Sequence, residues 1–425
     1  MSRLNELASV FFAALVVLAA CDDGAPPPPD AGFDGGVDAG PPPGMALCPA
    51  DAGRGPTPPG GLTNECTDAL VLSGFALRFD TGARPLARYA VYPRLGGDDL
   101  SACEASATFR TATIVGSLAG GTTPAVGHLG ARYAVVGVGM DRDRPDGGAP
   151  VPAIRMVRET LSMRLDAGNV ELTVPRRFDL LSAGLAGSPS IAVILDGVEL
   201  DTDLPQGIDF PASIDPAEGF ELARFGVSIG AITRVGDEIG FDLTARYAAG
   251  HDGSMVHDMA VDTLSVDVTV RYAVVAVPID PVYAQASYRW QNVPVGTEPA
   301  SVCRPGADVG EVTLSGSPAP HALAALTSFD FALFPDESDR RGIDVRELSV
   351  LIDGFDYDPV SGAATLTLEG YLTNEGDPVP ERAVDYAFSG EVVLLSWDGE
   401  GDVRTLRLDA DVSAGSAEAG VVLTP

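Results

Sequence analysis

The sequence predicts an all-β fold of the antiparallel β-sandwich type, and three observations support this prediction. Apolar and polar residues alternate with a period of two along many segments, tight-turn sequences separate these segments, and helical periodicity is weak. The chain has 425 residues, of which 45% are hydrophobic, and this is ample for a buried core. We expect one large β domain or two packed β domains.

The clearest strand covers residues 264–274, where the even-numbered positions are apolar or Tyr and the odd-numbered ones are polar as far as Arg271. Residues 241–247 and 406–412 alternate in the same way. This pattern is typical of strands that bury one face and expose the other. Each of the three segments is therefore expected to be a strand.

Turn sequences rich in Asp, Gly, Pro and Ser interrupt the apolar pattern at 166–168, 196–197, 358–362 and 398–401. These residue types favour tight turns, so we expect the chain to reverse direction at each of these places. The two best helical candidates are short, at 217–222 and 322–326.

One tetrapeptide recurs four times, as Arg-Tyr-Ala-Val at 88–91, 132–135 and 271–274 and as Arg-Tyr-Ala-Ala at 246–249. The irregular spacing argues against a solenoid. Two interpretations stay open, either a favoured strand pattern with Tyr inward and Arg at the surface, or a duplicated β unit. Residues 227–247 and 351–371 hint at duplication, because each segment reads as strand, turn and strand.

The charge of the chain argues against several classes of partner. The formal net charge is −33, and none of the 27 basic residues is Lys. A protein that binds nucleic acid needs a basic face to neutralise phosphates, and an anionic membrane surface attracts basic segments. We therefore predict no nucleic-acid partner and no electrostatic attraction to membranes. No cofactor is expected, since dinucleotide, phosphate-loop and His-Glu-x-x-His motifs are missing from the sequence.

The first 20 residues have the features of an export signal, with Arg3 followed by an apolar run over 7–20 that is too short for a stable transmembrane helix. This run ends in Leu-Ala-Ala-Cys at 18–21. The four residues resemble the lipobox of bacterial lipoproteins, L-[AS]-[AG]-C, at every position. The resemblance implies that Cys21 carries a thioether-linked diacylglycerol and an acylated amine, as palmitate-labelled lipoproteins do. Two or three acyl chains anchor a protein stably.

Residues 22–61 are expected to form a tether, because Pro, Gly, Asp and Ala dominate them and such a stretch cannot bury enough apolar surface to fold. The composition resembles the tethers of envelope lipoproteins from myxobacterium-like organisms. The predicted organisation is a signal peptide at 1–20, the lipidated Cys and a disordered tether at 21–61, and a β-rich body at 62–425. A candidate boundary inside the body lies near 305–322.

Four cysteines remain once Cys21 is acylated, namely Cys48, Cys66, Cys103 and Cys303. An even number in an exported chain favours two disulfides, with three connectivities to choose from. We favour Cys48–Cys66 together with Cys103–Cys303, because the first pair would fasten the tether to the start of the body. Closing a loop of about 18 residues stabilises a fold by about 3 kcal/mol in the chain-entropy model.

The best candidate for a metal site is formed by His251, Asp252, His257 and Asp258. Two of the four His residues of the chain lie six positions apart here, each followed by Asp, in a loop between two expected strands. A hairpin tip could bring both imidazoles and a carboxylate to a divalent transition metal, or to acid–base chemistry. The other interpretation is a polar loop with solvated side chains, which is the more frequent case.

Three further motifs favour structural interpretations. Residues 226–230 match G-x-S-x-G, but a nucleophile elbow needs a following helix and residues 231–247 read as a turn and a strand. Residues 141–148 miss the calcium-loop spacing by one position, so we interpret them as a surface loop. Strand alternation separates Asp353 from Asp356 and Asp358, which argues against a shared acidic site.

Aromatic residues suggest one candidate binding face. Tyr288 and Trp290 lie on the same face of an expected strand, with Tyr283 nearby, and could stack on a sugar ring or a peptide if they were exposed. The chain has only two Trp residues and 7% aromatics overall, so we expect Trp290 and Trp397 in the core.

Together these patterns predict a lipid-anchored envelope protein, at the outer membrane, the cell surface or the periplasmic face. Its acidic β-sandwich body would serve binding or structural roles, with a protein or glycan as the expected ligand. The sequence does not favour an enzyme. The alternative is an envelope-anchored hydrolase that uses a metal or carboxylate site near His251 to Asp258.

Overall fold

The structure is a computed structural model that describes fourteen parts of the chain, and every structural statement below concerns these residues. They are 67–79, 88–95, 104–112, 127–137, 154–166, 169–203, 222–251, 261–291, 309–335, 342, 345–374, 385–398, 402–412 and 415–422. The chain divides into two compact units, Met1–Met45 and Ala46–Pro425, and all of the described residues belong to the second unit.

The fold is all-β and antiparallel, as predicted from the sequence. Within the described residues the only α-helical segment is a single turn at 261–263. The strands are β1 (Thr67–Phe79), β2 (Arg88–Leu95), β3 (Glu104–Ala112), β4 (Gly127–Gly137), β5 (Arg155–Leu165), β6 (Glu171–Asp179), β7 (Ser190–Asp203), β8 (Leu222–Ile229), β9 (Thr233–Val235), β10 (Glu238–Ala249), β11 (Ser265–Val277), β12 (Val282–Gln291), β13 (Val309–Ser315), β14 (His321–Leu333), β15 (Val345–Asp358), β16 (Ala363–Asn374), β17 (Asp385–Trp397), β18 (Asp402–Val412) and β19 (Gly415–Val422).

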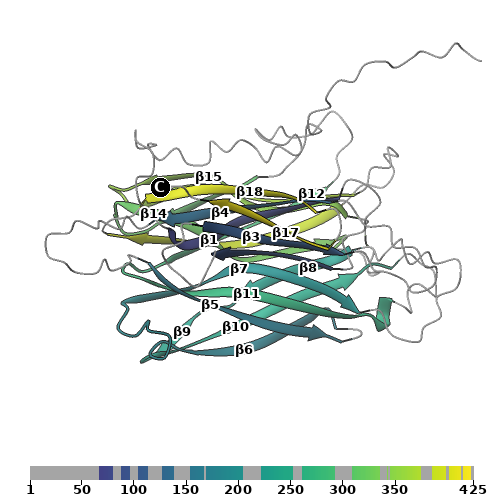
Figure 1. Cartoon of the computed structure of the whole chain (residues 1–425), viewed down its shortest axis with the longest axis horizontal. Helices are drawn as coiled ribbons and strands as arrows, with labels where there is room; N and C mark the ends of the chain where they lie inside the picture. Colours follow the sequence, from purple (N-terminus) through teal and green to yellow (C-terminus); the bar gives the residue numbers. More distant parts are fainter. Residues whose placement is uncertain are drawn as a thin grey trace, which may run out of the picture. The chain divides into compact units, whose positions relative to one another are not determined.

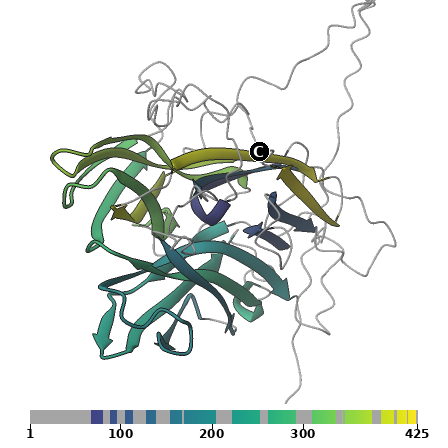
Figure 2. The same ribbon diagram turned by 60° about the vertical axis from the view of Figure 1, so that its left-hand side comes forward.

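These strands form three sheets. Sheet A has the order β13-β16-β15-β1-β4-β18, sheet B the order β19-β3-β2-β7-β11-β5, and sheet C the order β12-β17-β14-β8-β10-β6, with β9 pairing only with β10. Figure 1 shows β5, β7 and β11 of sheet B alongside β6, β8 and β10 of sheet C. In Figure 2 the same strands form the teal group in the lower half.

The strand order repeats three times along the chain. With the short strand β9 set aside, repeat 1 contains β1–β6, repeat 2 contains β7–β13 and repeat 3 contains β14–β19. In each sheet the strands take, from one edge to the other, the sixth, third, second, first, fourth and fifth positions of a repeat. Every sheet draws strands from all three repeats. The topology is therefore a pseudo-threefold arrangement in which the repeats interlock.

The pairing register confirms this equivalence at the level of single residues. The first strand of each repeat carries one extra residue in a β-bulge against the fourth strand, at Ser73, Asp196 and Thr327. Two positions after the bulge lie Phe75, Val198 and Phe329, all of which are buried. The rings of Phe75 and Phe329 meet edge to face with their centroids 5.3 Å apart.

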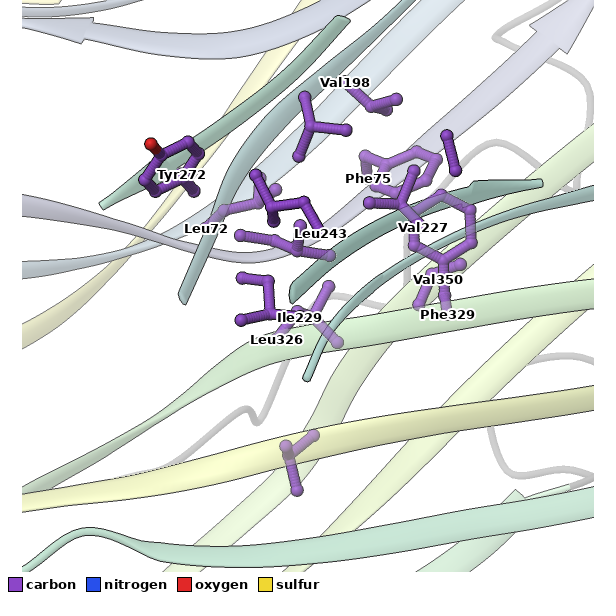
Figure 3. Close-up of a cluster of buried hydrophobic side chains, with 14 of the residues drawn as sticks. Leu72, Phe75, Val198, Val227, Ile229, Leu243, Tyr272, Leu326, Phe329 and Val350 are labelled. Carbon is purple, nitrogen blue, oxygen red and sulfur yellow. The ribbon is translucent and has the colours of Figure 1, made fainter. Parts of the chain in front are cut away.

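The first strands β1, β7 and β14 contact one another, and each is buried on both faces. In β7, for example, Val193 and Leu195 point into the larger core, whereas Ala192 and Ile194 point into a second core on the opposite face. Both cores collect residues from all three sheets. Figure 3 shows part of the larger core, where Leu72, Val227, Tyr272 and Leu326 converge. Burial of each such side chain contributes about 1.5–3 kcal/mol.

The edges of the sheets meet in pairs. The edge strands β5 and β6 are in contact, as are β12 and β13 and also β18 and β19, and each pair joins two different sheets. Each pair also consists of consecutive strands of the chain. An edge strand that ends at a corner with another sheet is partly protected from pairing with a second molecule.

Most strand predictions are confirmed, and two local predictions are wrong. Residues 241–247, 264–274 and 406–412 lie in β10, β11 and β18, although Leu264 itself precedes its strand. Residues 322–326 belong to β14 and are not helical, because burial on both faces makes the strand continuously apolar and removes the period-two signal. Residues 196–197 lie within β7 at its bulge and do not form a turn. The helical candidate 217–222 lies outside the described residues, apart from Leu222 in β8.

The recurring tetrapeptides all lie in strands, and where their side chains are described the Tyr residues point inward. Tyr247 and Tyr272 are buried. The copies at 132–135 and 271–274 occupy equivalent strands, β4 and β11, in the same register against the bulge. Residues 227–247 and 351–371 also lie in equivalent strand pairs. The topology therefore repeats one arrangement of strands three times, whereas the tetrapeptides at 88–91 and 246–249 lie in β2 and β10, which do not occupy equivalent positions. The boundary near 305–322 stays a prediction, although it coincides with the junction between repeats 2 and 3.

We predict that a chain ending at Ser315 does not form a stable native state. It lacks β14–β19, so β1 loses its partner β15, β8 loses β14 and β12 loses β17. The measurement is thermal unfolding followed by circular dichroism, with the full chain as control. A cooperative transition in the shortened chain, with the β content that its remaining strands require, would show that repeats 1 and 2 form a separate domain.

Candidate functional site

A buried carboxylate lies within sheet B at Asp196, the bulge residue of β7. Its side chain is almost fully buried, with a residue exposure of 2%. Arg158 on β5 donates from Nε to Asp196 Oδ2 at 2.8 Å and from Nη2 to the carbonyl oxygen of Leu70 on β1 at 2.7 Å. Arg158 therefore connects the strands β5 and β7 of sheet B to the strand β1 of sheet A. The other carboxylate oxygen, Oδ1, has no hydrogen-bond partner among the described residues.

Burial raises the pKa of Asp196 from 3.8 to about 6, and the positive charges of Arg158 and Arg271 oppose this rise. A carboxylate whose folded-state pKa is raised binds its proton more tightly in the folded state than in the unfolded chain. Ionisation of Asp196 thus costs stability at neutral pH, on the order of 3 kcal/mol, and this cost disappears as the pH falls through 6 towards 4. Strongly shifted groups of this kind are frequent at functional sites.

Sequence reasoning did not identify this site, because Asp-Gly inside a chain usually marks a turn. The signal that could have found it is the unbroken apolar pattern on both sides, over 191–195 and at Val198 and Leu200. A turn would have interrupted that pattern, whereas a bulge shifts it by one residue.

A second polar cluster lies on the face of sheet C opposite to the larger core. Arg224 on β8 holds Asp330 on β14 with two hydrogen bonds, from Nε to Oδ1 at 3.2 Å and from Nη2 to Oδ2 at 2.8 Å. Arg246 on β10 bonds Glu171 Oε2 at 2.9 Å and lies 4.0 Å from Asp330 Oδ2. The cluster links four strands of one sheet and balances two positive with two negative charges.

The G-x-S-x-G motif at 226–230 belongs to this cluster. Ser228 lies in β8, and its hydroxyl accepts a hydrogen bond from Arg246 Nη1 at 3.0 Å. The following residues form β9 and β10, so the strand, turn and helix of a nucleophile elbow are not formed here. Gly226 faces Asp330, and a Cβ added there would lie 2.4 Å from Asp330 Oδ1 and 2.8 Å from the Phe329 carbonyl oxygen. Gly226 is therefore required for the close approach of β8 and β14. This structural role agrees with the interpretation of the G-x-S-x-G match as a coincidence.

A third contact joins sheets B and C at the β5–β6 corner. The hydroxyl of Tyr272 donates to Glu159 Oε2 at 3.1 Å, and Arg176 bonds both the Tyr272 oxygen at 3.2 Å and Glu159 Oε2 at 3.3 Å. Tyr272 is the inward Tyr of a recurring tetrapeptide, so its ring lies in the core while its hydroxyl reaches the surface network.

The predicted metal ligands are only partly described. His251 lies two residues beyond β10, and its Nε2 is 3.3 Å from Asp262 Oδ1 in the helical turn at 261–263. Asp252, His257 and Asp258 lie outside the described residues. Within the described part of the chain, no group of three or more His, Cys, Asp or Glu side chains is arranged to hold a metal ion.

The acidic residues before the 358–362 turn lie on the strand differently from the prediction, which placed Asp353 on the opposite face from Asp356 and Asp358. A bulge at Gly354, with φ of +57°, places one extra residue between Asp353 and Asp356. Asp353 and Asp356 therefore pair with Thr367 and Thr365 and share one face of β15, which strict alternation would not allow. The 358–362 turn itself is confirmed by the hydrogen bond from the Gly362 N–H to the Asp358 carbonyl at 2.8 Å.

The aromatic candidates contribute mainly to the core. Trp397 is fully buried, as predicted, and Tyr288 is half-buried with its ring centroid 5.2 Å from that of Phe388. The Tyr288 hydroxyl accepts a hydrogen bond from the Gly370 N–H at 2.7 Å. Tyr283 lies on the opposite face of β12 and is 41% exposed. The side chain of Trp290 lies outside the described set.

The remaining sequence candidates cannot be placed in the fold. Cys21, Cys48, Cys66, Cys103 and Cys303 lie outside the described residues, as does the loop at 141–148. Lipidation of Cys21 and the two disulfides therefore stay predictions.

Comparisons with known proteins identify no relative. The chain matches no protein-family model, no curated protein and no solved structure. No helix in the described part of the chain has the length and apolar character that a membrane-spanning segment requires.

We predict that Gly226→Ala destabilises the fold by about 2–3 kcal/mol, because its Cβ would overlap the backbone of β14 as well as the Asp330 side chain. The measurement is the free energy of unfolding in denaturant. Gly230→Ala is the matched control, since the nearest atoms to its added Cβ are at 3.4 Å. Equal stability of the two variants would contradict the role given to Gly226.

Proposed function

We propose that this chain is a lipid-anchored envelope protein that holds an acidic β-rich body away from the membrane on a polar tether, for binding or structural roles. The observation that carries the proposal is the sequence Leu-Ala-Ala-Cys at 18–21, directly after an apolar run of signal-peptide length. Acylation of Cys21 would supply the anchor, and the Pro- and Gly-rich residues 22–61 would supply the reach.

The character of the described body supports this proposal. Sheet C carries Arg224, Asp330 and Arg246 in mutual ion pairs on the face opposite to the larger core, where their side chains stay partly accessible to water. The sheet edges meet at corners, so a body displayed at high density on a surface has few free edges for unwanted pairing. The net charge of −33 would repel the body from anionic envelope surfaces.

The proposal includes two disulfides, Cys48–Cys66 and Cys103–Cys303, because an exported chain with four remaining cysteines is exposed to oxidising conditions. It also includes a protein or glycan of the envelope as the ligand class. A binding role is proposed by analogy with other β-sandwich scaffolds, which present their binding loops at the ends of the sheets.

We predict that Cys21→Ala abolishes incorporation of radiolabelled palmitate, because only the thiol at the cleavage site can form the thioether. Cys48→Ala is the matched control and should keep the label, since Cys48 is proposed to pair with another cysteine. The measurement is labelling of cells that express each full-length variant. If the wild-type chain takes up no palmitate and keeps its first 20 residues, the lipoprotein proposal is wrong.

A further inference from the structure

The bulge on the first strand of each repeat does not need a carboxylate. Ser73 and Thr327 occupy the positions equivalent to Asp196, and both are buried hydroxyl residues in bulges of the same register. All three positions face the fourth strand of their own repeat at the same place. The fold therefore accepts a neutral residue there, and the buried charge of Asp196 calls for a separate explanation.

The equivalent site in repeat 3 shows which hydrogen bond the ionised carboxylate of Asp196 cannot form. The Thr327 hydroxyl donates a hydrogen bond to the carbonyl oxygen of Glu391 at 3.1 Å. The register makes Arg271 the equivalent of Glu391, so the Arg271 carbonyl is the corresponding acceptor beside Asp196. An ionised carboxylate has no hydrogen to donate, whereas a protonated one has a hydroxyl like that of Thr327. This difference accounts for the buried Oδ1 atom without a partner.

The charged groups that act on Asp196 come from two strands. Arg158 on β5 bonds Oδ2, and Arg271 on β11 acts on the carboxylate through its positive charge. The strand β1 of sheet A contributes the Leu70 carbonyl, which Arg158 also bonds. Both arginines favour the ionised carboxylate, and its complete burial favours the protonated form.

We propose that Asp196 is a proton-binding site that couples the contact between sheets A and B to mildly acidic pH. A proton from solvent binds to Oδ1, and the new hydroxyl donates to the Arg271 carbonyl as Thr327 does to Glu391. The site loses its negative charge, and the ion pair to Arg158 becomes a weaker bond to a neutral acid. Arg158 stays protonated, and its side chain, which is 31% exposed, is free to turn towards water and to leave the Leu70 carbonyl.

This inference does not depend on the lipid anchor or on a ligand. It gives the body a response to the pH of its surroundings. The response is local, because the other two bulges carry hydroxyl groups that do not titrate in this range.

The first test is the pH dependence of unfolding for the full chain and for Asp196→Thr, which installs the residue of repeat 3. Relative to this variant, the folded-to-unfolded ratio of the wild type should rise on the order of 50- to 100-fold between pH 7 and pH 4. Asp267→Asn is the control, since Asp267 forms an exposed ion pair with Arg164 on the same two strands. Its pH dependence should match that of the wild type.

The second test is a carbon-13 titration of the side-chain carboxyl groups, with the Asp196 resonance assigned by its loss in Asp196→Asn. We expect a midpoint near pH 6 that moves upward in Arg158→Gln, because the ion pair opposes protonation. If Asp196→Thr does not fold, this titration alone tests whether Asp196 binds a proton near pH 6. A midpoint below pH 4.5, or the same pH dependence for the wild type and Asp196→Thr, would overturn the proposal.

Discussion

Burial of three strands on both faces is the constraint on which the rest of the structure depends. The strands β1, β7 and β14 begin the three repeats, contact one another, and separate two hydrophobic cores. Such strands cannot alternate between apolar and polar residues, so their sequences are continuously apolar ahead of the bulge. This apolar run ends at the bulge, where a polar residue occupies the extra position that does not follow the pleat, and polar residues such as Asp330 occur again beyond it.

Interlocking of the repeats follows from this arrangement. Each first strand pairs on one side with the fourth strand of its own repeat and on the other with the second strand of the repeat before it in the cycle. No repeat can therefore satisfy its backbone hydrogen bonds alone. The chain resembles a covalently linked trimer of one six-stranded unit, in which the corners between sheets are closed by the fifth and sixth strands.

The fold class and the strands over 241–247, 264–274 and 406–412 could be predicted from the sequence, because strands such as β10 and β11 keep one polar face along part of their length and show a clear period of two. The threefold repeat was visible only as fragments, since the tetrapeptide persists at 132–135 and 271–274 but is replaced in β17. Two of the failures share a cause, because residues 322–326 in β14 and 196–197 in β7 lie in strands that are buried on both faces, where tertiary contacts remove the local signals on which sequence reasoning depends. The third, at Asp353 and Asp356, follows from the bulge at Gly354.

The candidate site could not be predicted for a related reason. Asp196 meets Arg158 and the Leu70 carbonyl only through pairing of strands that are distant in sequence. No spacing rule connects these positions, and the comparison that makes the site distinctive is with Ser73 and Thr327. That comparison requires the register of all three bulges, which only the structure supplies.

The claim that the three repeats form one interlocked unit is tested most directly by native-state hydrogen exchange. The slowest amides of β1, β7 and β14 should exchange with the same free energy, equal to that of global unfolding, because each strand is held by the other two. If the amides of one of these strands exchange through a separate opening of clearly lower free energy, that repeat unfolds independently and the account is contradicted.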